Sequence, residues 1–400
     1  NLGFLLNQTG EYAKALKYLT KALEKMPNKA QLWNDLGYTC SKLNKFTDAI
    51  NCYQKALRIE PSNFDSYLEL AKIYTFEAID LEKSEYYIQK CISSNPNHPE
   101  LSVPLRFFKA NSIRKKILNA AKILPKHDLS VETLEVINYL ETKAYTTFPY
   151  KFTQKYTKRN VPVYYDTALE MVYIVENDKK LYFKRGMSKE VVINSYNYVS
   201  LEQDELSPHR YLTNEIKMLG TIPSGATDTG FTVNPGDVVV DLGVAEGNFA
   251  FSVIDLASKI YLFECDPGWI RALEATFRNY SDKVVIVSKY VSDIDDAKNV
   301  SLDTYFAANE RVNFIKMDVE GYEWSALQGM KKTLTANPDL RAAVCTYHYP
   351  LDSENFSIFF QERGFEISFS RGYMLFNMYE FDPPHLRKGV LRAKKKIILP

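Results

Sequence analysis

The sequence predicts an α/β fold with a mostly parallel sheet, preceded by an all-α array of helices. The N-terminal hundred residues repeat with a period of 34, which is typical of stacked helical pairs. The C-terminal half alternates short apolar runs with helical patterns, and this alternation indicates a parallel sheet. One apolar run leads through two glycines into a helix at residues 237–249. These three patterns predict two domains of different class.

The composition limits the classes of function. Four hundred residues exceed one ordinary core, so we expect at least two domains. Fifty Lys and Arg balance 49 Asp and Glu, and this charge of +1 predicts neither nucleic acid nor a membrane as a partner. No run approaches the roughly 18 apolar residues of a membrane span. Five scattered cysteines without C-x-x-C spacing favour a reducing cytoplasm over disulfides or structural zinc.

The N-terminal repeat places small residues and prolines at equivalent positions of successive units. Small residues allow two antiparallel helices to approach closely, and a closing proline ends the second helix. The third unit carries one extra residue near Glu77. Residues 1–100 are therefore predicted to form a helical repeat domain. The recurring positions are Leu2, Leu36 and Leu70, Gly3 and Gly37, Ala15 and Ala49, Ala22 and Ala56, and Pro27 and Pro61.

This pattern resembles the tetratricopeptide repeat (TPR), and the middle unit matches it almost completely. The matching residues are Trp33, Leu36, Gly37, Ala49, Tyr53, Ala56 and Pro61. The resemblance implies a concave groove, towards which Asn34, Tyr38, Lys42 and Lys72 are expected to point. A protein or peptide partner could bind there. Because short repeat arrays also form dimers or fixed spacers, a homodimer is an alternative.

The segment between the repeats and the sheet, residues 101–160, has a helical pattern and is predicted to bridge the two domains. Two strand-like runs follow it, residues 171–175 and 180–183. They are joined across Asn177-Asp178, as in a β-hairpin. The change of period marks the start of the second domain.

The second domain is predicted to span residues 161–390. Five apolar runs separated by helical patterns predict five parallel strands. Two further runs are separated only by Arg371-Gly372 and must pair antiparallel, because a parallel crossover needs about a dozen residues or more. The parallel runs are residues 238–241, 260–264, 284–288, 314–317 and 342–346, and the antiparallel pair is 366–370 and 373–379.

Basic residues cluster near the end of the sequence. We interpret residues 391–400 as a solvated basic tail rather than a site for an anionic partner. The clustered residues are Arg387, Lys388, Arg392, Lys394, Lys395 and Lys396.

The glycine turn at residues 237–249 has the spacing D-x-G-x-x-x-G-x-F and lacks the third glycine of a dinucleotide-binding turn. Gly243 and Gly247 let the backbone approach a ligand closely, although a tight turn without a ligand is the plain alternative. The next strand ends in Glu264, about twenty residues later, where doubly wound folds place an acid against ribose hydroxyls. Asp266 is the second candidate for this contact. The spacing is the form found in S-adenosylmethionine-dependent methyltransferases.

The segments that follow the predicted strands closely resemble the FkbM family of S-adenosylmethionine-dependent methyltransferases, over about residues 165–379. The most specific element runs from Lys316 to Glu323. The resemblance implies a Rossmann-like seven-stranded methyltransferase sheet, S-adenosyl-L-methionine as cofactor, and methyl transfer, most often to a hydroxyl of a sugar or natural product. The expected cofactor residues are Asp241, Gly243, Glu246, Gly247, Asn248 and Phe249 in the loop, Glu264 and Asp266 at the ribose, and Ser292 and Asp293 at the adenine.

The candidate catalytic residues are His348, His209 and Asp318, because ligands in open α/β sheets bind beyond the carboxyl ends of the strands. An alcohol must lose its proton before it attacks, and a histidine with a pKa of about 6.5 is a suitable base. His348 is the first candidate and His209 the second. Ordinary roles are the alternatives: Asp318 and Glu320 as carboxylates at a helix N-terminus, and the histidines as hydrogen-bonded packing groups.

A divalent cation is a further alternative for this group of residues. Asp318, Glu320 and His348 could hold magnesium, which would lower the pKa of the alcohol. The preferred expectation is a site without a metal.

The sequence therefore predicts a soluble, cytoplasmic methyltransferase that acts on a small-molecule, glycan or peptide acceptor. Its TPR array recruits a protein or peptide, or forms a dimer. A second hypothesis is N-methylation of a peptide or protein side chain. A third is a non-catalytic scaffold with a cofactor-binding domain, which the presence of Asp241, Gly243, Gly247, Glu264 and Asp318 weakens.

Overall fold

The computed structural model of the chain forms two compact units, residues Asn1–Ile123 and Leu124–Pro400. The expected bridge, residues 101–160, is divided between these units. In the part of the chain that the structure describes, no helix has the length and apolar character needed to cross a bilayer. The described residues are 2–77, 80–125, 127, 129–143, 145–156, 161–213, 231–306, 310–375 and 383–395.

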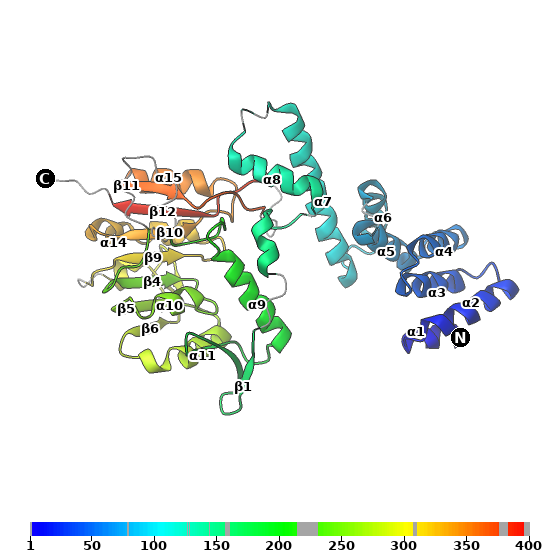
Figure 1. Ribbon diagram of the computed structural model, residues 1–400, viewed down its shortest axis with the longest axis horizontal. Coiled ribbons are helices and arrows are strands. Elements are labelled where there is room, and N and C mark those ends of the chain that lie inside the picture. The colour runs from blue at the N-terminus through cyan, green and yellow to red at the C-terminus, as the bar shows by residue number, and fades with distance from the viewer. Residues whose placement is uncertain are drawn as a thin grey trace. The chain divides into compact units, whose positions relative to one another are not determined.

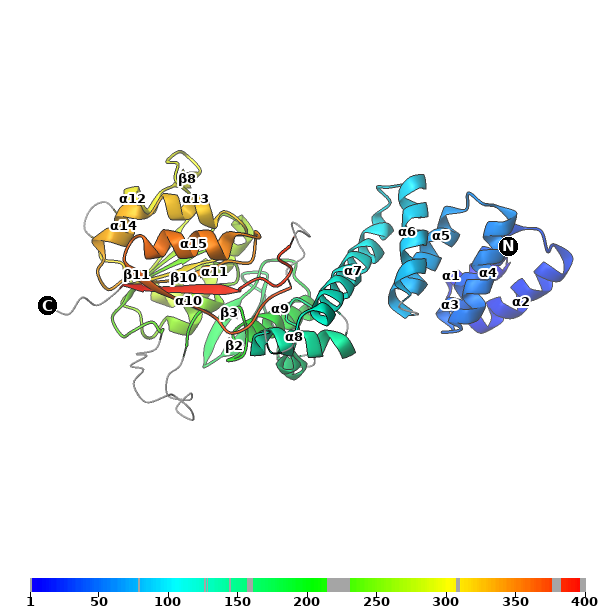
Figure 2. The ribbon, with the colours of Figure 1, turned by 90° about the horizontal axis from the view of Figure 1, so that it is seen from above.

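The N-terminal unit consists of consecutive helices that pack against each other in pairs (Figure 2). The helix that carries Gly37 approaches the helix that carries Tyr53 closely because glycine has no side chain: a Cβ at Gly37 would lie 2.8 Å from the buried ring of Tyr53. The all-helical repeat array is therefore confirmed. The helices are α1 Leu2–Gln8, α2 Tyr12–Lys25, α3 Ala30–Lys42, α4 Phe46–Ile59, α5 Phe64–Lys72, α6 Leu81–Ser94, the short 3-10 turn η2 Pro99–Leu101 and α7 Ser102–Ile123.

The extra residue of the third repeat lies in a π-helical turn, η1 Ile73–Glu77, which continues directly from α5. A π-turn closes its hydrogen bond one residue later than an α-turn, so it absorbs one inserted residue without ending the helix. The insertion expected near Glu77 thus has a local structural explanation.

The four residues expected to line a groove make contacts within the array. Asn34 is 9% exposed. Lys72 Nζ forms an ion pair with Glu100 Oε2 at 2.5 Å. Lys42 Nζ lies 5.1 Å from the centre of the Tyr38 ring. A partner that uses these side chains must therefore replace existing contacts.

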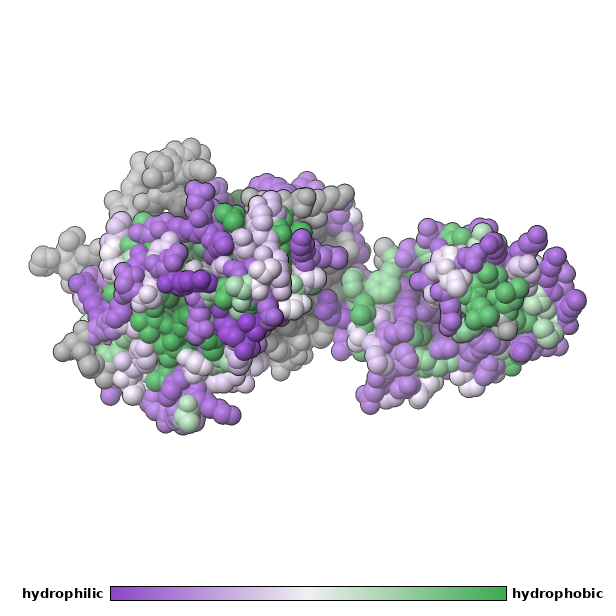
Figure 3. All heavy atoms as spheres, turned by 90° about the horizontal axis from the view of Figure 1, so that it is seen from below, coloured by the Kyte–Doolittle hydropathy of each residue, from purple (hydrophilic) through white to green (hydrophobic). Residues whose placement is uncertain are grey.

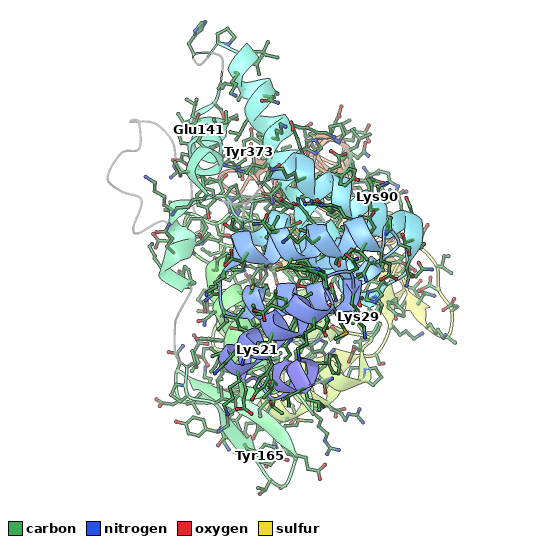
Figure 4. The ribbon with its side chains drawn as sticks, turned by 90° about the vertical axis from the view of Figure 1, so that its right-hand side faces the viewer. Lys21, Lys29, Lys90, Glu141, Tyr165 and Tyr373 are labelled. Atoms are coloured by element: carbon green, nitrogen blue, oxygen red, sulfur yellow. The ribbon has the colours of Figure 1, made fainter. Side chains whose placement is uncertain are left out.

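The surface of the N-terminal unit carries both charged and apolar side chains. Lys21 on α2, Lys29 before α3 and Lys90 on α6 are exposed (Figure 4). Apolar residues also reach the surface of this unit (Figure 3), and on α7 they include Val103 and Phe107. The unit therefore offers several kinds of surface for contact with another protein.

The C-terminal unit is built on a seven-stranded sheet with the order β11-β12-β10-β9-β4-β5-β6 (Figure 1). The five strands from β10 to β6 are parallel, and β12 is antiparallel to both of its neighbours. This confirms the expected α/β fold with a mostly parallel sheet. The strands are β4 Val238–Leu242, β5 Lys259–Phe263, β6 Val284–Val287, β9 Phe314–Met317, β10 Arg341–Cys345, β11 Phe365–Phe369 and β12 Val390–Lys395.

Both faces of the sheet are buried, which explains why its strands are continuous apolar runs. Val239 packs in one core and the next residue, Val240, in the other. Helices α12 to α15 lie on one side of the sheet and α10 on the other (Figure 2). The helices are α10 Asn248–Val253, α11 Pro267–Thr276, α12 Leu302–Tyr305, α13 Glu323–Gln328, α14 Lys331–Ala336 and α15 Asp352–Gln361.

Smaller elements precede and accompany the sheet. Strands β2 and β3 form the expected hairpin, and its two turn residues, Asn177 and Asp178, both have positive φ, as a tight hairpin turn requires. Ser188 caps α9, because its side chain accepts a hydrogen bond from the Val191 amide. These elements are α8 Val131–Thr142, η4 Lys151–Tyr156, β1 Tyr164–Asp166, β2 Met171–Glu176, β3 Lys179–Tyr182, α9 Lys189–Glu202, η6 Arg278–Tyr280, β7 Tyr290–Val291 and β8 Asn299–Val300.

The antiparallel pair at the edge of the sheet differs from the prediction. Strand β11 pairs with β12, so the expected partner at residues 373–379 is wrong. Of that run, Met374 forms a single bridge with Arg387, and residues 376–379 lie outside the described part of the chain. Strand β12 contains both apolar and basic residues. The basic residues led to the incorrect prediction of a solvated tail.

The expected basic tail is therefore also corrected over residues 391–395, which belong to β12. Leu391 and Ala393 are fully buried, and Arg387 and Arg392 are 3% and 8% exposed. Residues 396–400 lie outside the described part of the chain.

Replacing Leu391 by alanine tests this correction. Leu391 is 0% exposed, so we expect Leu391→Ala to lower the free energy of unfolding of the C-terminal unit by about 2–5 kcal/mol in urea denaturation. The control is Leu256→Ala, at a leucine that is 43% exposed, where a change within about 0.5 kcal/mol is expected. If both substitutions changed the free energy of unfolding by equally small amounts, the result would support the prediction of a solvated tail.

Candidate active site

The glycine turn after β4 packs directly against the end of β9. Gly243 has a φ of +73°, and a Cβ there would lie 1.8 Å from the carbonyl oxygen of Asp318. The Asp318 amide donates to the carbonyl of Leu242 at 3.0 Å. Gly247, with a φ of +82°, is the N-cap of α10. The backbone of the turn is thus fixed by its contacts with Asp318.

The carboxylate of Glu264, directly after β5, fixes the same turn from the neighbouring strand. Its Oε2 accepts a hydrogen bond from the Ala245 amide at 2.9 Å. Its Oε1 accepts from the amides of Cys265 at 2.7 Å and Asp266 at 2.8 Å. Glu264 is partly exposed and lies beside the turn.

The other residues expected at the cofactor already have partners in the chain. Asp266 caps α11 through the amides of Gly268 and Trp269 and pairs with Lys184 at 2.9 Å. The ring of Phe249 lies in the core. The remaining contacts are Glu246 with Ser195 at 2.6 Å, Asp293 with Ser325 at 2.6 Å, and Ser292 with Ile294 at 3.1 Å, while Asn248 is the first residue of α10.

A buried ion pair connects β4 and β9 beneath the turn. Lys316 Nζ lies 3.1 Å from Asp241 Oδ1 and donates to the Gly243 carbonyl at 2.5 Å. Burial alone would lower the pKa of Lys316, but the charges of Asp241 and Asp318 outweigh it and raise the pKa. The lysine is therefore charged at neutral pH, and it holds both the acid of β4 and the backbone of the turn.

Asp318 is the centre of a second cluster. His209 Nε2 lies 3.3 Å from Asp318 Oδ2. The hydroxyls of Tyr211 and Tyr347 both donate to the Asp318 carboxylate at 3.1 Å. On its other side, His209 Nδ1 lies 3.1 Å from Oε1 of Glu202, the last residue of α9. The structure thus brings together segments from α9, β9 and β10.

His348 lies between carboxylates from the turn after β9. Its Nδ1 is 3.1 Å from Glu323 Oε1. Its Nε2 is 3.7 Å from Asp318 Oδ1 and 3.6 Å from Glu320 Oε2. His348 and Glu323 are fully buried, whereas the Glu320 side chain is 67% exposed. The three expected catalytic residues, His348, His209 and Asp318, are therefore neighbours in one cluster.

The charges of this cluster determine its protonation. Burial opposes a charged imidazole, but Glu320 and Glu323 outweigh it and raise the pKa of His348 to about 10. Burial would lower the pKa of His209, but the Glu202 and Asp318 carboxylates outweigh it and raise this pKa well above its ordinary value. Both imidazole rings are therefore protonated on both nitrogens and positively charged at neutral pH. A role for His348 as general base remains a prediction and requires one of its protons to leave first.

Two buried arginines hold the segments that carry the histidines. Arg387 donates to the carbonyls of Tyr347 and His348 at 2.8 and 2.7 Å. Arg392 of β12 donates to the carbonyls of Tyr211 and Arg210 at 3.0 and 2.7 Å. The basic residues near the C-terminus are thus part of the framework of the site.

Several residues of this site were not among the predicted ones. They are Lys316, Glu323, Glu202, Tyr211 and Tyr347. Lys316 had a usable signal, because a lysine inside the apolar run of a central strand needs a buried partner. The others lie beside predicted residues in the sequence, and only their packing identifies them.

The close approach at Gly243 makes a specific stability prediction. In Gly243→Ala, the positive φ costs about 1–2 kcal/mol, and displacing the Asp318 backbone adds about 1–3 kcal/mol. Gly364→Ala is the matched control, because Gly364 has a φ of +77° with nothing within 4 Å of the added Cβ. Urea denaturation should show the larger loss for Gly243→Ala. Equal losses would mean that the turn does not depend on this contact.

The buried pair of Lys316 and Asp241 makes a second prediction. Lys316→Met leaves a carboxylate that is 1% exposed without its cation, and we expect a loss of about 3–5 kcal/mol in the free energy of unfolding. The control is Lys259→Met, which breaks a pair with Glu310 whose side chains are each 37% exposed, where at most about 1 kcal/mol is expected. Similar small losses in both variants would contradict the structural role of Lys316.

Comparisons with known proteins give matches to both parts of the chain. Residues 257–378 match the family described as the methyltransferase FkbM domain, and residues 1–24 and 30–63 match tetratricopeptide repeats. Among solved structures, the methyltransferase FkbM from Methylobacillus flagellatus KT is 19% identical, with a TM-score of 0.33, and the alignment covers 41% of this chain and 44% of that one.

Two curated relatives match shorter parts of the chain. The tetratricopeptide repeat-containing protein trd-1 of Caenorhabditis elegans is 27% identical over 101 residues, which is 25% of this chain and 13% of that protein. The peroxisomal targeting signal receptor of Kluyveromyces lactis is 38% identical over 61 residues, 15% of this chain and 11% of that protein. The chain thus spans only a small share of either relative. Its N-terminal segments match tetratricopeptide repeats, and its C-terminal segment matches the methyltransferase FkbM domain.

Proposed function

We propose that the C-terminal unit transfers a methyl group from S-adenosyl-L-methionine to a hydroxyl of a sugar or natural product. The observation that carries this proposal is the position of Asp318. Its backbone carbonyl packs against Gly243 of the glycine turn, and its side chain contacts His209 and faces His348. A donor held by the turn and an acceptor held by the histidine cluster would therefore meet at one residue.

The chain has the features that such a donor requires. Gly243 and Gly247 have positive φ, a conformation that glycine adopts readily and that the tight turn beside the donor would require. Glu264 lies at the end of the adjacent strand, where its carboxylate would accept hydrogen bonds from ribose hydroxyls. Asp241 and the turn would contact the methionine part, with Ser292 and Asp293 on the adenine side.

The donor supplies a methyl group on a sulfonium that is its own leaving group. What remains for the protein is to hold the acceptor oxygen in line, exclude water and remove one proton. Asp318, His209 and His348 are grouped where they can hold that oxygen and its proton. Lys316 keeps the turn and the strand end in a fixed relation, which positions both substrates.

The N-terminal unit is proposed to bind a protein or peptide. Tetratricopeptide repeats cover residues 1–24 and 30–63, and the exposed surface of the unit carries both lysines and apolar side chains. If the bound peptide is itself the acceptor, the product is an N-methylated side chain. Methylation of free glycans without any protein would count against this second function.

Calorimetry with S-adenosyl-L-methionine distinguishes a chain that binds this methyl donor from a non-catalytic scaffold that does not bind it. Wild-type chain should bind the donor, and a concentration of 100 times Kd should stabilise it by about 2.7 kcal/mol. Glu264→Ala should abolish this binding, whereas Asp255→Ala, at an exposed carboxylate that pairs with Lys179, should leave it unchanged. No heat and no thermal stabilisation in the wild-type chain would support the scaffold.

Removal of the His348 side chain tests the acceptor side. We expect His348→Ala to keep its affinity for the donor while turnover falls on the order of a hundredfold, because the group that handles the acceptor proton is lost. His98→Ala, in the repeat unit, is the control and should keep its turnover with a small acceptor. Unchanged turnover in His348→Ala would remove this residue from the mechanism.

A further inference from the structure

Helix α9, which lies at one end of the strands of the sheet (Figure 1), carries two polar side chains that contact two different parts of the site. The Ser195 hydroxyl donates to Oε1 of Glu246, in the glycine turn, at 2.6 Å. Seven residues later, Glu202 Oε1 lies 3.1 Å from Nδ1 of His209. Because an α-helix has 3.6 residues per turn, side chains seven residues apart lie on the same face. One face of one helix therefore contacts both the turn and the histidine.

We propose that α9 couples the glycine turn to His209, with Ser195 and Glu202 as positioning residues. Ser195 holds Glu246 of the turn, and Glu202 holds the imidazole of His209. The catalytic meaning of this coupling rests on the proposed function, because the coupling would align the acceptor histidine when the donor fills the turn. The two contacts themselves belong to the fold of the chain.

The face of α9 that carries these residues packs against the core of the unit. Val192 and Tyr196 belong to the same helical stripe and are 0% and 8% exposed. Ser195 and Glu202 are partly buried along this stripe. Since a packed helix is a rigid element, a displacement at Ser195 also moves the carboxylate of Glu202.

Both ends of α9 are anchored by side chains. Ser188 caps its first turn. Directly after its last turn, the carboxylate of Asp204 accepts a hydrogen bond from the Tyr156 hydroxyl at 2.6 Å. These contacts oppose fraying of the helix, so the spacing between Ser195 and Glu202 is kept.

The glycine turn depends on contacts of this kind for its shape. Ala245 has a φ of +47°, a conformation that residues with a Cβ rarely adopt. On the side of β5, the Ala245 amide donates to Glu264 Oε2 at 2.9 Å. On the side of α9, the next residue, Glu246, accepts from Ser195. Removing the Ser195 hydroxyl therefore releases the turn on one of its two sides.

Asp318 offers a second route between the turn and the histidine. Its backbone packs against Gly243, and its Oδ2 lies 3.3 Å from Nε2 of His209. A donor could therefore influence His209 without α9. Substitution of Ser195 separates the two routes, because it breaks the contact of α9 with the turn and keeps the side chain and backbone of Asp318.

Nuclear magnetic resonance of the full chain labelled with ¹⁵N-histidine tests the coupling, since the chain has five histidines. In the absence of donor, Ser195→Ala should shift the ring signals of His209, and Ser195→Thr, which keeps the hydroxyl, should restore them. Ser200→Ala is the matched control on the same helix, because the Ser200 hydroxyl donates to the carbonyl of Tyr196. It should leave the His209 signals unchanged.

Addition of S-adenosyl-L-methionine tests the same coupling from the other side. In wild type, the donor should shift the His209 signals. In Ser195→Ala this shift should be smaller at saturating donor, and the donor affinity measured by calorimetry should fall at least about fivefold. Glu202→Gln should lower the donor affinity as well, because a coupling between two positions acts in both directions. Ser200→Ala should keep the wild-type affinity.

The outcomes distinguish the failure of this coupling from the failure of the proposed function. Circular dichroism first shows that each variant is folded. Identical His209 signals in wild type and Ser195→Ala without donor overturn the coupling. A donor-induced shift of equal size in both chains also overturns it, while donor binding leaves the methyltransferase proposal standing. If wild type binds no donor, but its His209 signals move in Ser195→Ala and return in Ser195→Thr, the coupling is supported and the methyltransferase proposal is overturned.

Discussion

A buried charge beneath the glycine turn is the constraint on which the C-terminal unit depends. Lys316 and Asp241 are 5% and 0% exposed, so neither charge is tolerable without the other. The same ammonium group donates to the carbonyl of Gly243. The shape of the turn is therefore set by an ion pair between two central strands, and a ligand at the turn meets a backbone that is already fixed.

The site is assembled from segments that are distant in the sequence. Asp318 receives contacts from residues 209–211 and 347–348, and Gly243 packs against its carbonyl. Arg387 and Arg392 hold the two histidine segments by their backbone carbonyls. Because these arginines come after the last parallel strand, the site is complete only when the final strand has entered the sheet.

The sequence predicted the parallel strands within one or two residues, because strands buried on both faces are continuous apolar runs with clear limits. The hairpin at Asn177-Asp178 and the helical pairs followed from turn chemistry and from the 34-residue period. Strand β12 was missed for a physical reason: its arginine and lysines suggested solvent, although Arg392 is buried against carbonyl groups. A basic composition does not predict solvent exposure when backbone carbonyl groups accept the hydrogen bonds of a buried arginine.

The sequence by itself determined the two kinds of fold and the positions of Asp241, Glu264, Asp318 and His348 at or directly after strands, since local periodicity and turn residues specify these. It also named His209, Asp318 and His348 as candidates. Only the tertiary structure decided which acids face which nitrogen of His348, and that both histidines are held among carboxylates. The physical reason is that protonation depends on distances of a few ångströms between segments, and side-chain packing alone sets those distances.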